Sequence, residues 1–484
     1  MSILIKNALR IYTMDDSLQE FEKGYLRIEN NLISALGKGD PGPLQADEVI
    51  DAKGKVILPG LINVHHHFYQ NLTRNVSVAR KSGLLSWLLS MYRIWAGIDE
   101  EAVYYASLVA IGELLLTGCT TTADFFYLFP DGRRHLIDSE FQAARELGIR
   151  FHGFRGCLPV MEGTIAQDLK RDFSFDPERL TETEDQILQA CEEAFRRHHD
   201  PSEFSMARVG VGPTTVVYEQ PFLMKSLKEL AVKHGGLCQT HLHPRPDEIE
   251  QCRALHACSP LQFLEEIGWL DGQTAIGHAT RHQPRDLDIL ARNHCTVTHS
   301  PSCHMRLGYP VAPVPGMISR GIPVGIGVDG GASNDTGDLL GELRTTMMVH
   351  RIEGVHPGLK PEDWLGPHDV FRMATRNGAT ILNRKDIGSL EVGKAADLIV
   401  VDLSGIPYAG ALSDPLGALV YCGCSHVVDT SIINGKRVVR DGRLTQASEE
   451  KICQKANEIA KRLLDRVSEG DRASSNPLEI ESKG

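Results

Sequence analysis

Three histidines and one aspartate follow short apolar runs in this chain, and together these residue types can bind a transition metal. His65 and His67 flank His66 in "PGLINVHHHFYQ", while His241 and Asp329 lie in "CQTHLH" and "GIGVDG". Alternate side chains of a β-strand point the same way, so His65 and His67 share one face and His66 points to the other. Three imidazoles and a carboxylate suit a borderline divalent cation with an open position for water. Such a cation lowers the pKa of that water and supplies hydroxide at neutral pH.

Further histidines follow the next two apolar runs. His278 lies in "TAIGHA", His299 in "CTVTHSP" and His304 in "HSPSCHMRLG". A single buried histidine is more often a hydrogen-bonded core residue than a ligand, and His304 either shapes its loop or contacts a substrate. Imidazoles at the ends of several separate strands are much harder to explain by chance. The whole set therefore indicates a functional site.

The runs that carry these residues alternate with helical stretches. Apolar residues recur at helical spacing in "EEAVYYASLVAIGELLLTG", for example, and this stretch closes on Gly118. Strand alternating with helix eight times predicts a (β/α)8 TIM barrel, in which chemistry collects at the C-terminal ends of the strands. The eight predicted strands cover residues 56–64, 120–126, 150–156, 208–213, 237–243, 274–279, 295–301 and 323–330.

Both ends of the chain have a different residue pattern from the middle. Stretches such as "ILIKNALRIYT" and "AADLIVVDL" read as β-strands separated by turn residues. We therefore expect a small β-sandwich domain made from residues 1–57 and 386–446. The barrel is predicted to occupy residues 58–385, and residues 447–484 are predicted to form a charged amphipathic helix and a tail.

Composition excludes several classes of partner. The chain has 484 residues, a formal net charge of −12 and no long basic run, which disfavours binding to nucleic acid or an anionic membrane. No apolar stretch approaches the length of a membrane span, and the N-terminus lacks the pattern of a signal peptide. The 11 cysteines are scattered, which is typical of reduced thiols. We expect a cytoplasmic protein whose partner is a small molecule.

The motifs resemble those of the amidohydrolase superfamily. The resemblance is carried by "PGLINVHHH", "GCTTTADF", "THLH", "GHA", "HSP" and "GVDGGASND", and it covers residues 3 to about 445. The more similar branch is the cytosine/guanine-deaminase-like group, which includes 8-oxoguanine deaminase, isoxanthopterin deaminase and the s-triazine hydrolases. Segments such as "SPLQFLEEIGWL", "GDLLGELRTTMMVHR" and "FRMATRNGA" resemble the triazine and hydroxyatrazine hydrolases in particular.

This resemblance implies one divalent metal ion, usually Zn²⁺ and sometimes Fe²⁺. His65, His67, His241 and Asp329 match the family's ligand positions, and Asp329 can also accept a proton from the water. His278 matches a histidine on strand six that orients the water or polarises the leaving group. The fourth strand reads "ARVGVGPTT" and lacks the lysine of two-metal members, which favours a single ion. Dimers are common in such families, so a homodimer is compatible with the resemblance.

The chain departs from the family at one catalytic position. Deaminases of this branch carry His-x-x-Glu after strand five, but here "HLHP" places Pro244 where the glutamate would be. Proline cannot transfer a proton. His243, Asp247 or Glu248 could replace the glutamate, and we favour His243; alternatively, the strand-six and strand-eight residues suffice and the proline only shapes the loop.

Residues near the first histidines are candidates for substrate binding. The carboxamide of Gln70 can both donate and accept hydrogen bonds, so it suits a ring N–H next to a carbonyl. Trp87, Phe68 and Tyr69 could stack on a flat heterocycle, although packing in a core or lid is the commoner role of such aromatics. His304 is a third candidate for contact with the substrate.

Three functions remain open from these observations. The leading hypothesis is a hydrolase that replaces an exocyclic amino or alkylamino group of an aromatic N-heterocycle by a carbonyl. Its substrate would be a guanine-like purine, a pterin or an s-triazine. The second is hydrolysis of a non-aromatic cyclic amide. The third is a non-catalytic assembly protein, which is disfavoured because such relatives typically lose ligands and this chain keeps four ligand positions.

Overall fold

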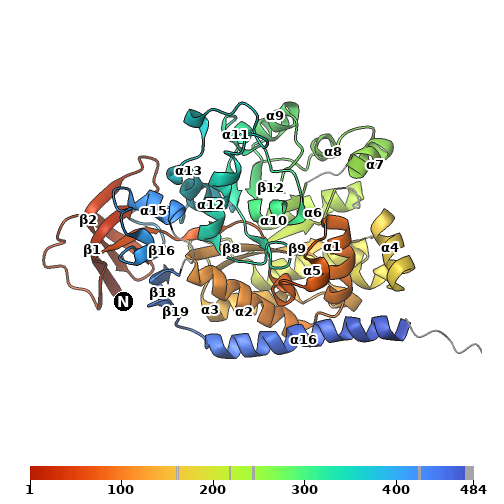
Figure 1. Ribbon diagram of the computed structural model, residues 1–484, viewed down its shortest axis with the longest axis horizontal. Coiled ribbons are helices and arrows are strands. Elements are labelled where there is room, and N and C mark those ends of the chain that lie inside the picture. Colours follow the sequence, from red (N-terminus) through yellow and green to blue (C-terminus); the bar gives the residue numbers. More distant parts are fainter. Residues whose placement is uncertain (160, 162, 217–219, 243–245, 423–426, 475–484) are drawn as a thin grey trace, which may run out of the picture.

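The computed structural model describes residues 1–484 except 160, 162, 217–219, 243–245, 423–426 and 475–484. The chain forms a barrel surrounded by helices and, beside it, a sheet built from both chain ends (Figure 1). This arrangement confirms the fold class predicted from the sequence.

Eight parallel strands form the barrel, in sequence order around the sheet. The last strand meets the first, because the Val64 amide donates to the Ile326 carbonyl at 3.2 Å and the short strands β7 (His66–His67) and β15 (Asp329–Gly330) pair in parallel. The eight strands are β6 (Leu61–Asn63), β8 (Cys119–Phe126), β9 (Arg150–Cys157), β10 (Ala207–Pro213), β11 (Leu237–His241), β12 (Thr274–Gly277), β13 (Thr296–His299) and β14 (Val324–Ile326).

The first predicted strand differs from the structure in one respect. Instead of one strand over residues 56–64, the chain forms β5 (Lys55–Pro59) in the sheet of the chain ends and then β6 in the barrel. Gly60 lies between them, and a Cβ atom there would lie 2.0 Å from Oγ1 of Thr120. The chain therefore changes from one sheet to the other at a residue without a side chain, where backbone and neighbour approach closely.

Helices surround the barrel, and several begin and end with standard capping residues. Asp99 accepts from the Ala102 amide at the start of α2, Thr183 and Gln186 form a capping box at α5, and Gly235 adopts a left-handed conformation after α6. The helices are α1 (Leu84–Trp95), α2 (Glu100–Leu116), α3 (Ile137–Leu147), α4 (Gly163–Phe173), α5 (Glu184–His198), α6 (Pro221–His234), α7 (Pro246–His256), α8 (Pro260–Glu266), α9 (Pro284–Arg292), α10 (Pro301–Leu307), α11 (Val314–Ile318), α12 (Leu339–Val349), α13 (Pro367–Arg372), α14 (Gly378–Ile381) and α15 (Pro415–Tyr421).

Both chain ends contribute to one nine-stranded sheet with a small core of its own. β5 pairs with β1 on one side and β16 on the other, so it joins the N-terminal strands to the C-terminal ones. The strands besides β5 are β1 (Ser2–Tyr12), β2 (Glu20–Glu29), β3 (Leu32–Lys38), β4 (Glu48–Asp51), β16 (Leu398–Asp402), β17 (Thr430–Ile433), β18 (Lys436–Arg440) and β19 (Arg443–Leu444).

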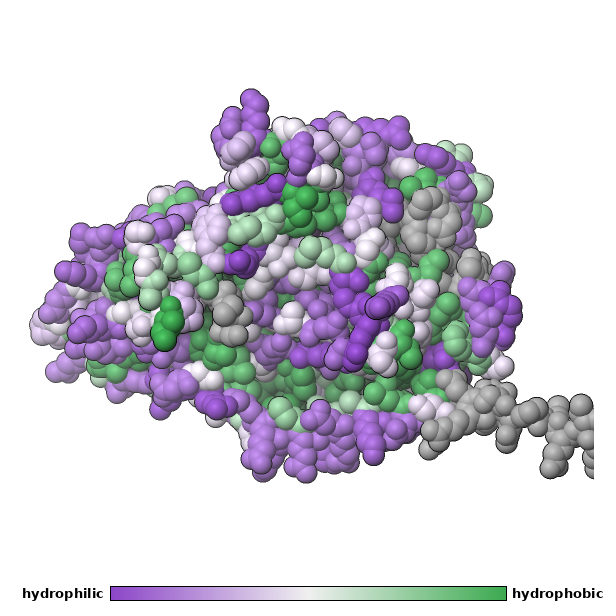
Figure 2. All heavy atoms as spheres, viewed as in Figure 1, coloured by the Kyte–Doolittle hydropathy of each residue, from purple (hydrophilic) through white to green (hydrophobic). Residues whose placement is uncertain are grey.

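A long C-terminal helix, α16 (Glu449–Ser474), lies along the outside of the barrel beside α2 (Figure 1). Its apolar residues Ile452, Ile459 and Leu463 are buried against the barrel. The outward side is hydrophilic, as Figure 2 shows along the lower edge of the molecule. The helix is therefore amphipathic, as its sequence predicts. Within the described chain, no helix combines the length and the apolar character that crossing a bilayer would require.

Candidate metal centre

The histidine pair after β6 lies buried at the C-terminal end of the barrel. The rings of His65 and His67 have centroids 4.9 Å apart and meet edge to face. His66 packs its ring against Phe68 instead and accepts a hydrogen bond from the His67 amide through Nδ1. The alternation predicted from the sequence thus brings two of the three neighbouring imidazoles together.

The hydrogen bonds of His67 and His241 determine where each ring carries its hydrogen. His67 Nδ1 lies 2.6 Å from the Phe125 carbonyl oxygen, and His241 Nδ1 lies 2.8 Å from the Thr214 carbonyl oxygen. A carbonyl only accepts, so each Nδ1 carries the hydrogen and each Nε2 presents a lone pair. Burial, reinforced by the neighbouring His65, lowers the pKa of His67 to about 4, so this ring is neutral at pH 7.

His65 has the same orientation through a side-chain partner. Its Nδ1 lies 2.6 Å from Oε1 of Gln239, and the amide nitrogen of Gln239 donates to the Val64 carbonyl at 3.2 Å. The second bond identifies which end of the carboxamide faces His65, so Nδ1 of His65 is the donor. Nε2 of His65 is buried and has no hydrogen-bond partner in the part of the chain that the structure describes.

Asp329 brings a carboxylate close to two of these three nitrogens. Its Oδ1 lies 3.5 Å from Nε2 of His67 and 3.8 Å from Nε2 of His65. Burial would raise the pKa of Asp329, but His65 and His67, together with hydrogen bonds to the side chain, lower it below its usual value. The carboxylate is therefore ionised at neutral pH although it is 4% exposed.

The four predicted ligands fall in two overlapping groups, each of which could hold a divalent cation. Ligand atoms of His65, His67 and Asp329 lie within 4.8 Å of one another, and so do those of His65, His241 and His278. The two groups share His65, and Nε2 of His241 lies 3.3 Å from Nε2 of His67. Lone pairs and an anionic oxygen this close together are costly in a buried place unless a cation compensates them. This donor set is the one that Zn²⁺ and similar ions prefer.

His278, another predicted catalytic residue, lies beside Asp329 and shares a cluster with His65 and His241. His278 Nε2 lies 3.9 Å from Oδ2 of Asp329, and its Nδ1 lies 3.1 Å from Nε2 of the buried His304 on α10. The structure thus brings His304 to the site through His278. His243 falls outside the described residues, and Glu248 lies buried on α7.

Two predicted substrate-binding residues lie beside the strand that carries Asp329. Gln70 packs against Gly330 so closely that a Cβ atom at residue 330 would lie 1.9 Å from the Gln70 Oε1. The indole nitrogen of Trp87 donates to the Ala332 carbonyl at 3.0 Å, and its ring meets Trp95 edge to face. Gln70 therefore borders the metal centre directly, whereas Trp87 lies in an aromatic cluster behind it.

A pair of buried carboxyl groups lies behind His67. Oδ1 of Asp124, on β8, accepts from the Phe68 amide at 2.5 Å, and Glu140 from α3 faces the same carboxyl group. Burial raises the pKa of both groups, and the charge of Asp124 raises the pKa of Glu140 further. Burial therefore favours the protonated form of this pair, and Asp124 holds the backbone directly after His67.

Sequence reasoning missed Gln239 and Asp124. Gln239 precedes His241 by two residues on β11, so the period of a strand places both on the inner face and could have identified it. Asp124 points away from the barrel interior toward α3, and only the packing of that helix reveals its partner. The Phe125 and Thr214 contributions are backbone carbonyls, which leave no signal in residue type.

Comparison with known proteins places the chain in a family. The model of the amidohydrolase family matches residues 56–438. Hydroxydechloroatrazine ethylaminohydrolase of Pseudomonas sp. (strain ADP) is 35% identical over 87% of this chain and 86% of its own length. The 8-oxoguanine deaminase of Pseudomonas aeruginosa is 32% identical over 90% of this chain and 94% of its own length.

Solved structures agree with this placement. Atrazine chlorohydrolase from Arthrobacter aurescens TC1, in complex with zinc, superposes with a TM-score of 0.86 at 31% identity. The match covers 95% of this chain and 100% of that one. The resemblance inferred from the motifs is confirmed: the chain belongs to the amidohydrolase family.

Proposed function

We propose that this chain is a metal-dependent hydrolytic deaminase, which replaces an amino or alkylamino group of an aromatic N-heterocycle by a carbonyl. The observation that carries the proposal is a buried cluster of three Nε2 lone pairs, each fixed by a hydrogen bond at Nδ1, two of which face the carboxylate of Asp329. The names of the two relatives support the substrate class, because one is an ethylaminohydrolase of hydroxydechloroatrazine and the other a deaminase of 8-oxoguanine.

His65, His67, His241 and Asp329 would hold the ion, and the donor set together with the zinc complex of the solved relative favours Zn²⁺ over Fe²⁺. A bound divalent ion makes a water molecule acidic enough to act as a nucleophile at neutral pH. The neutral imidazole of His67 and the ionised carboxylate of Asp329 already have the protonation states that metal binding requires.

Asp329 can serve two roles because its two oxygens face different neighbours. Oδ1 faces the ligand imidazoles of His65 and His67, while Oδ2 faces His278. The lowered pKa keeps Asp329 ionised, so Oδ2 can accept the proton of the attacking water. Proton transfer from the water to the substrate can therefore pass through Oδ2.

His278 is held in place for contact with the reacting groups. Its Nδ1 is hydrogen-bonded to His304, which orients the ring, and its Nε2 lies too far from Oδ2 of Asp329, at 3.9 Å, for a direct hydrogen bond. His278 is proposed to contact the attacking water or the leaving amino group, because one of its ring nitrogens lies within 4.8 Å of ligand atoms of His65 and His241. His243 is proposed to protonate a ring nitrogen in place of the family glutamate.

Gln70 is proposed to read the edge of the heterocycle, because its carboxamide lies against Gly330 next to Asp329. Trp87 is proposed to act as part of the wall, since its indole nitrogen is already used by the Ala332 carbonyl. A homodimer and a cytoplasmic location stay predictions; light scattering of the purified protein would measure the former.

A release assay tests the function. Purified protein is screened for ammonia or amine release from aminopurines, pterins, aminopyrimidines and amino-s-triazines, with hydantoins and lactams as the alternative class. We expect turnover in the first group, its loss in Asp329→Asn, and its retention in the control Asp363→Asn, which alters an exposed carboxylate. Turnover confined to cyclic amides, or retained in Asp329→Asn, would contradict the proposal.

A further inference from the structure

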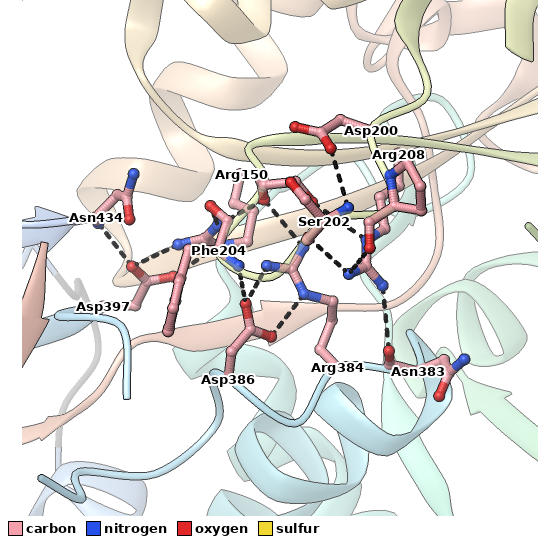
Figure 3. A network of polar contacts seen from close by, with 12 residues as sticks. Arg150, Asp200, Ser202, Phe204, Arg208, Asn383, Arg384, Asp386, Asp397 and Asn434 are labelled. Atoms are coloured by element: carbon pink, nitrogen blue, oxygen red, sulfur yellow. Dashed lines mark hydrogen bonds and ion pairs between the residues drawn. The ribbon is translucent and has the colours of Figure 1, made fainter. Parts of the chain in front are cut away.

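The opposite end of the barrel from the metal centre contains a dense group of buried charges, drawn in Figure 3. Arg150, at the start of β9, donates two hydrogen bonds to Asp397, at 2.9 and 3.0 Å. Arg384 donates two to Asp386, at 2.8 and 2.6 Å. Each of these guanidinium groups has a carboxylate in ideal two-point geometry.

Arg208, at the start of β10, lacks such a partner. Its guanidinium donates to the carbonyl oxygens of Asn383 and Ser202, both at 3.2 Å, and the bond to Asn383 is visible in Figure 3. No carboxylate of the described residues lies within ion-pair distance of it. Burial, followed by repulsion from Arg384, lowers the pKa of Arg208 to about 10, so its charge is poorly compensated.

A small cavity adjoins this guanidinium. It is lined by Arg208, His152, His199 and Asn383 together with apolar residues of the strands. The cavity leaves about 10 Å³ for the centre of a water-sized sphere, which is room for one water molecule or one monatomic ion. Anions with several heavy atoms, such as phosphate, are too large.

Each of the two histidines has a buried ring nitrogen without a hydrogen-bond partner among the described residues. His199 accepts the Val209 amide through Nδ1 at 2.9 Å, so its hydrogen is on Nε2, and that atom is buried without a partner among the described residues. Nε2 of His152, a residue only 3% exposed, is likewise buried and unpartnered in that part of the chain. Burial lowers the pKa of His152, and Arg384, Arg208 and Arg150 lower it further, which shows that the local potential is positive.

We propose that this cavity binds a single halide ion, chloride under cellular conditions, held by His152, His199 and the charge of Arg208. A halide ion fits this volume and can accept the hydrogen on Nε2 of His199, for which the described residues provide no acceptor. Its negative charge also compensates the guanidinium of Arg208, which has no carboxylate partner among the described residues. Its weak hydration suits the apolar remainder of the lining.

The ion would stabilise the junction of the two sheets rather than take part in the chemistry. Asp397 belongs to the chain-end region and also accepts from the Asn434 amide at 2.7 Å, so the arginine group links the barrel floor to that region. The site lies at the N-terminal ends of β9, β10 and β11, whereas the metal centre lies at the C-terminal ends of the strands. Halide binding is therefore expected to alter stability and leave turnover unchanged.

Bromide is a direct probe. Crystals of the full chain soaked in sodium bromide are expected to show one anomalous peak in this cavity, and its absence would overturn the proposal. In solution, the unfolding temperature is measured in sodium chloride and in sodium gluconate at equal ionic strength. We expect a value roughly 1–2 °C higher in chloride.

Variants separate specific binding from a general salt effect. Arg208→Gln is expected to abolish the difference between chloride and gluconate, and the control Arg196→Gln, on the exposed side of α5, is expected to retain it. Arg208→Lys keeps the charge and provides a second test if Arg208→Gln does not fold. In this lysine variant, the difference in unfolding temperature between chloride and gluconate is expected to persist but to be smaller. A difference equal to that of the unmodified protein in Arg208→Gln, or none in the unmodified protein, would overturn the proposal.

Discussion

The Nε2 atoms of His67 and His241 lie 3.3 Å apart, and neither ring can place a hydrogen between them. Each ring already donates its hydrogen to a carbonyl on the other side, so two lone pairs face each other in a buried place. Such a contact is repulsive unless a cation lies beside both nitrogens. The geometry of this pair is therefore stronger evidence for a bound metal than the residue types alone.

Removing one of these nitrogens is expected to empty the centre. In His67→Ala, the metal content of purified protein should fall from about one ion per chain to near zero. Mass spectrometry of the metal measures this directly. Treatment of the unmodified protein with a chelator should have the same effect on turnover, and added zinc should restore it. Near-stoichiometric metal in His67→Ala would refute the ligand assignment.

Gln239 is expected to affect metal affinity indirectly, because it contacts the ligand His65. In Gln239→Leu, Nδ1 of His65 loses the acceptor that fixes its tautomer, and we expect metal affinity to fall about 10- to 100-fold. Competition with a chelating dye measures the affinity. Gln189→Leu, which changes an exposed glutamine of α5, is the control and should leave affinity unchanged. Equal affinities in the two variants would show that Gln239 does not orient the ring.

The buried carboxyl pair behind His67 predicts a difference between two substitutions. Asp124→Ala leaves the Phe68 amide without its acceptor, so we expect metal affinity to fall roughly tenfold. Glu140→Gln keeps a neutral hydrogen-bond donor beside Asp124 and should change affinity much less. Both affinities are compared with the unfolding temperature of each variant. A loss of affinity that only follows the loss of stability would argue against a positioning role.

The pair of Arg384 and Asp386 predicts how stability responds to acid. Burial would raise the pKa of Asp386, but hydrogen bonds and charge from Arg384 lower it to about 2. An unfolded aspartate titrates at about 3.9, so the unfolded state binds more protons below that value. The stability that the pair contributes is therefore present above about pH 4 and is lost as pH falls toward about 2.

Asp386→Asn tests this response. Breaking a buried pair leaves the guanidinium uncompensated, and we expect the variant to lose about 3–5 kcal/mol of unfolding free energy at pH 7. Denaturant unfolding between pH 2 and pH 7 should show a smaller dependence on pH in the variant. Asp363→Asn, at an exposed carboxylate, should follow the unmodified protein. An unchanged acid dependence in Asp386→Asn would contradict the assignment.

Much of the architecture follows from residue type and period. Alternation of apolar runs with helical stretches predicted eight barrel strands, and all eight are present. The exception is the run over residues 56–64, which looks like one strand because both sheets bury their residues equally. Gly60 marks the change between sheets, but a glycine within an apolar run has several explanations in sequence.

The candidate site, too, has features that the sequence predicts and others that only the tertiary structure decides. The identities and spacings of His65, His67, His241 and Asp329 are sufficient to predict a metal centre, because strand period and barrel closure bring them to one end. The tautomer of each imidazole depends instead on contacts between strands, namely the carbonyls of Phe125 and Thr214 and the carboxamide of Gln239. Every residue has a backbone carbonyl, so residue type does not predict which carbonyl an imidazole will hydrogen-bond to. That choice requires the closed barrel, in which neighbouring strands present their carbonyl groups at defined distances.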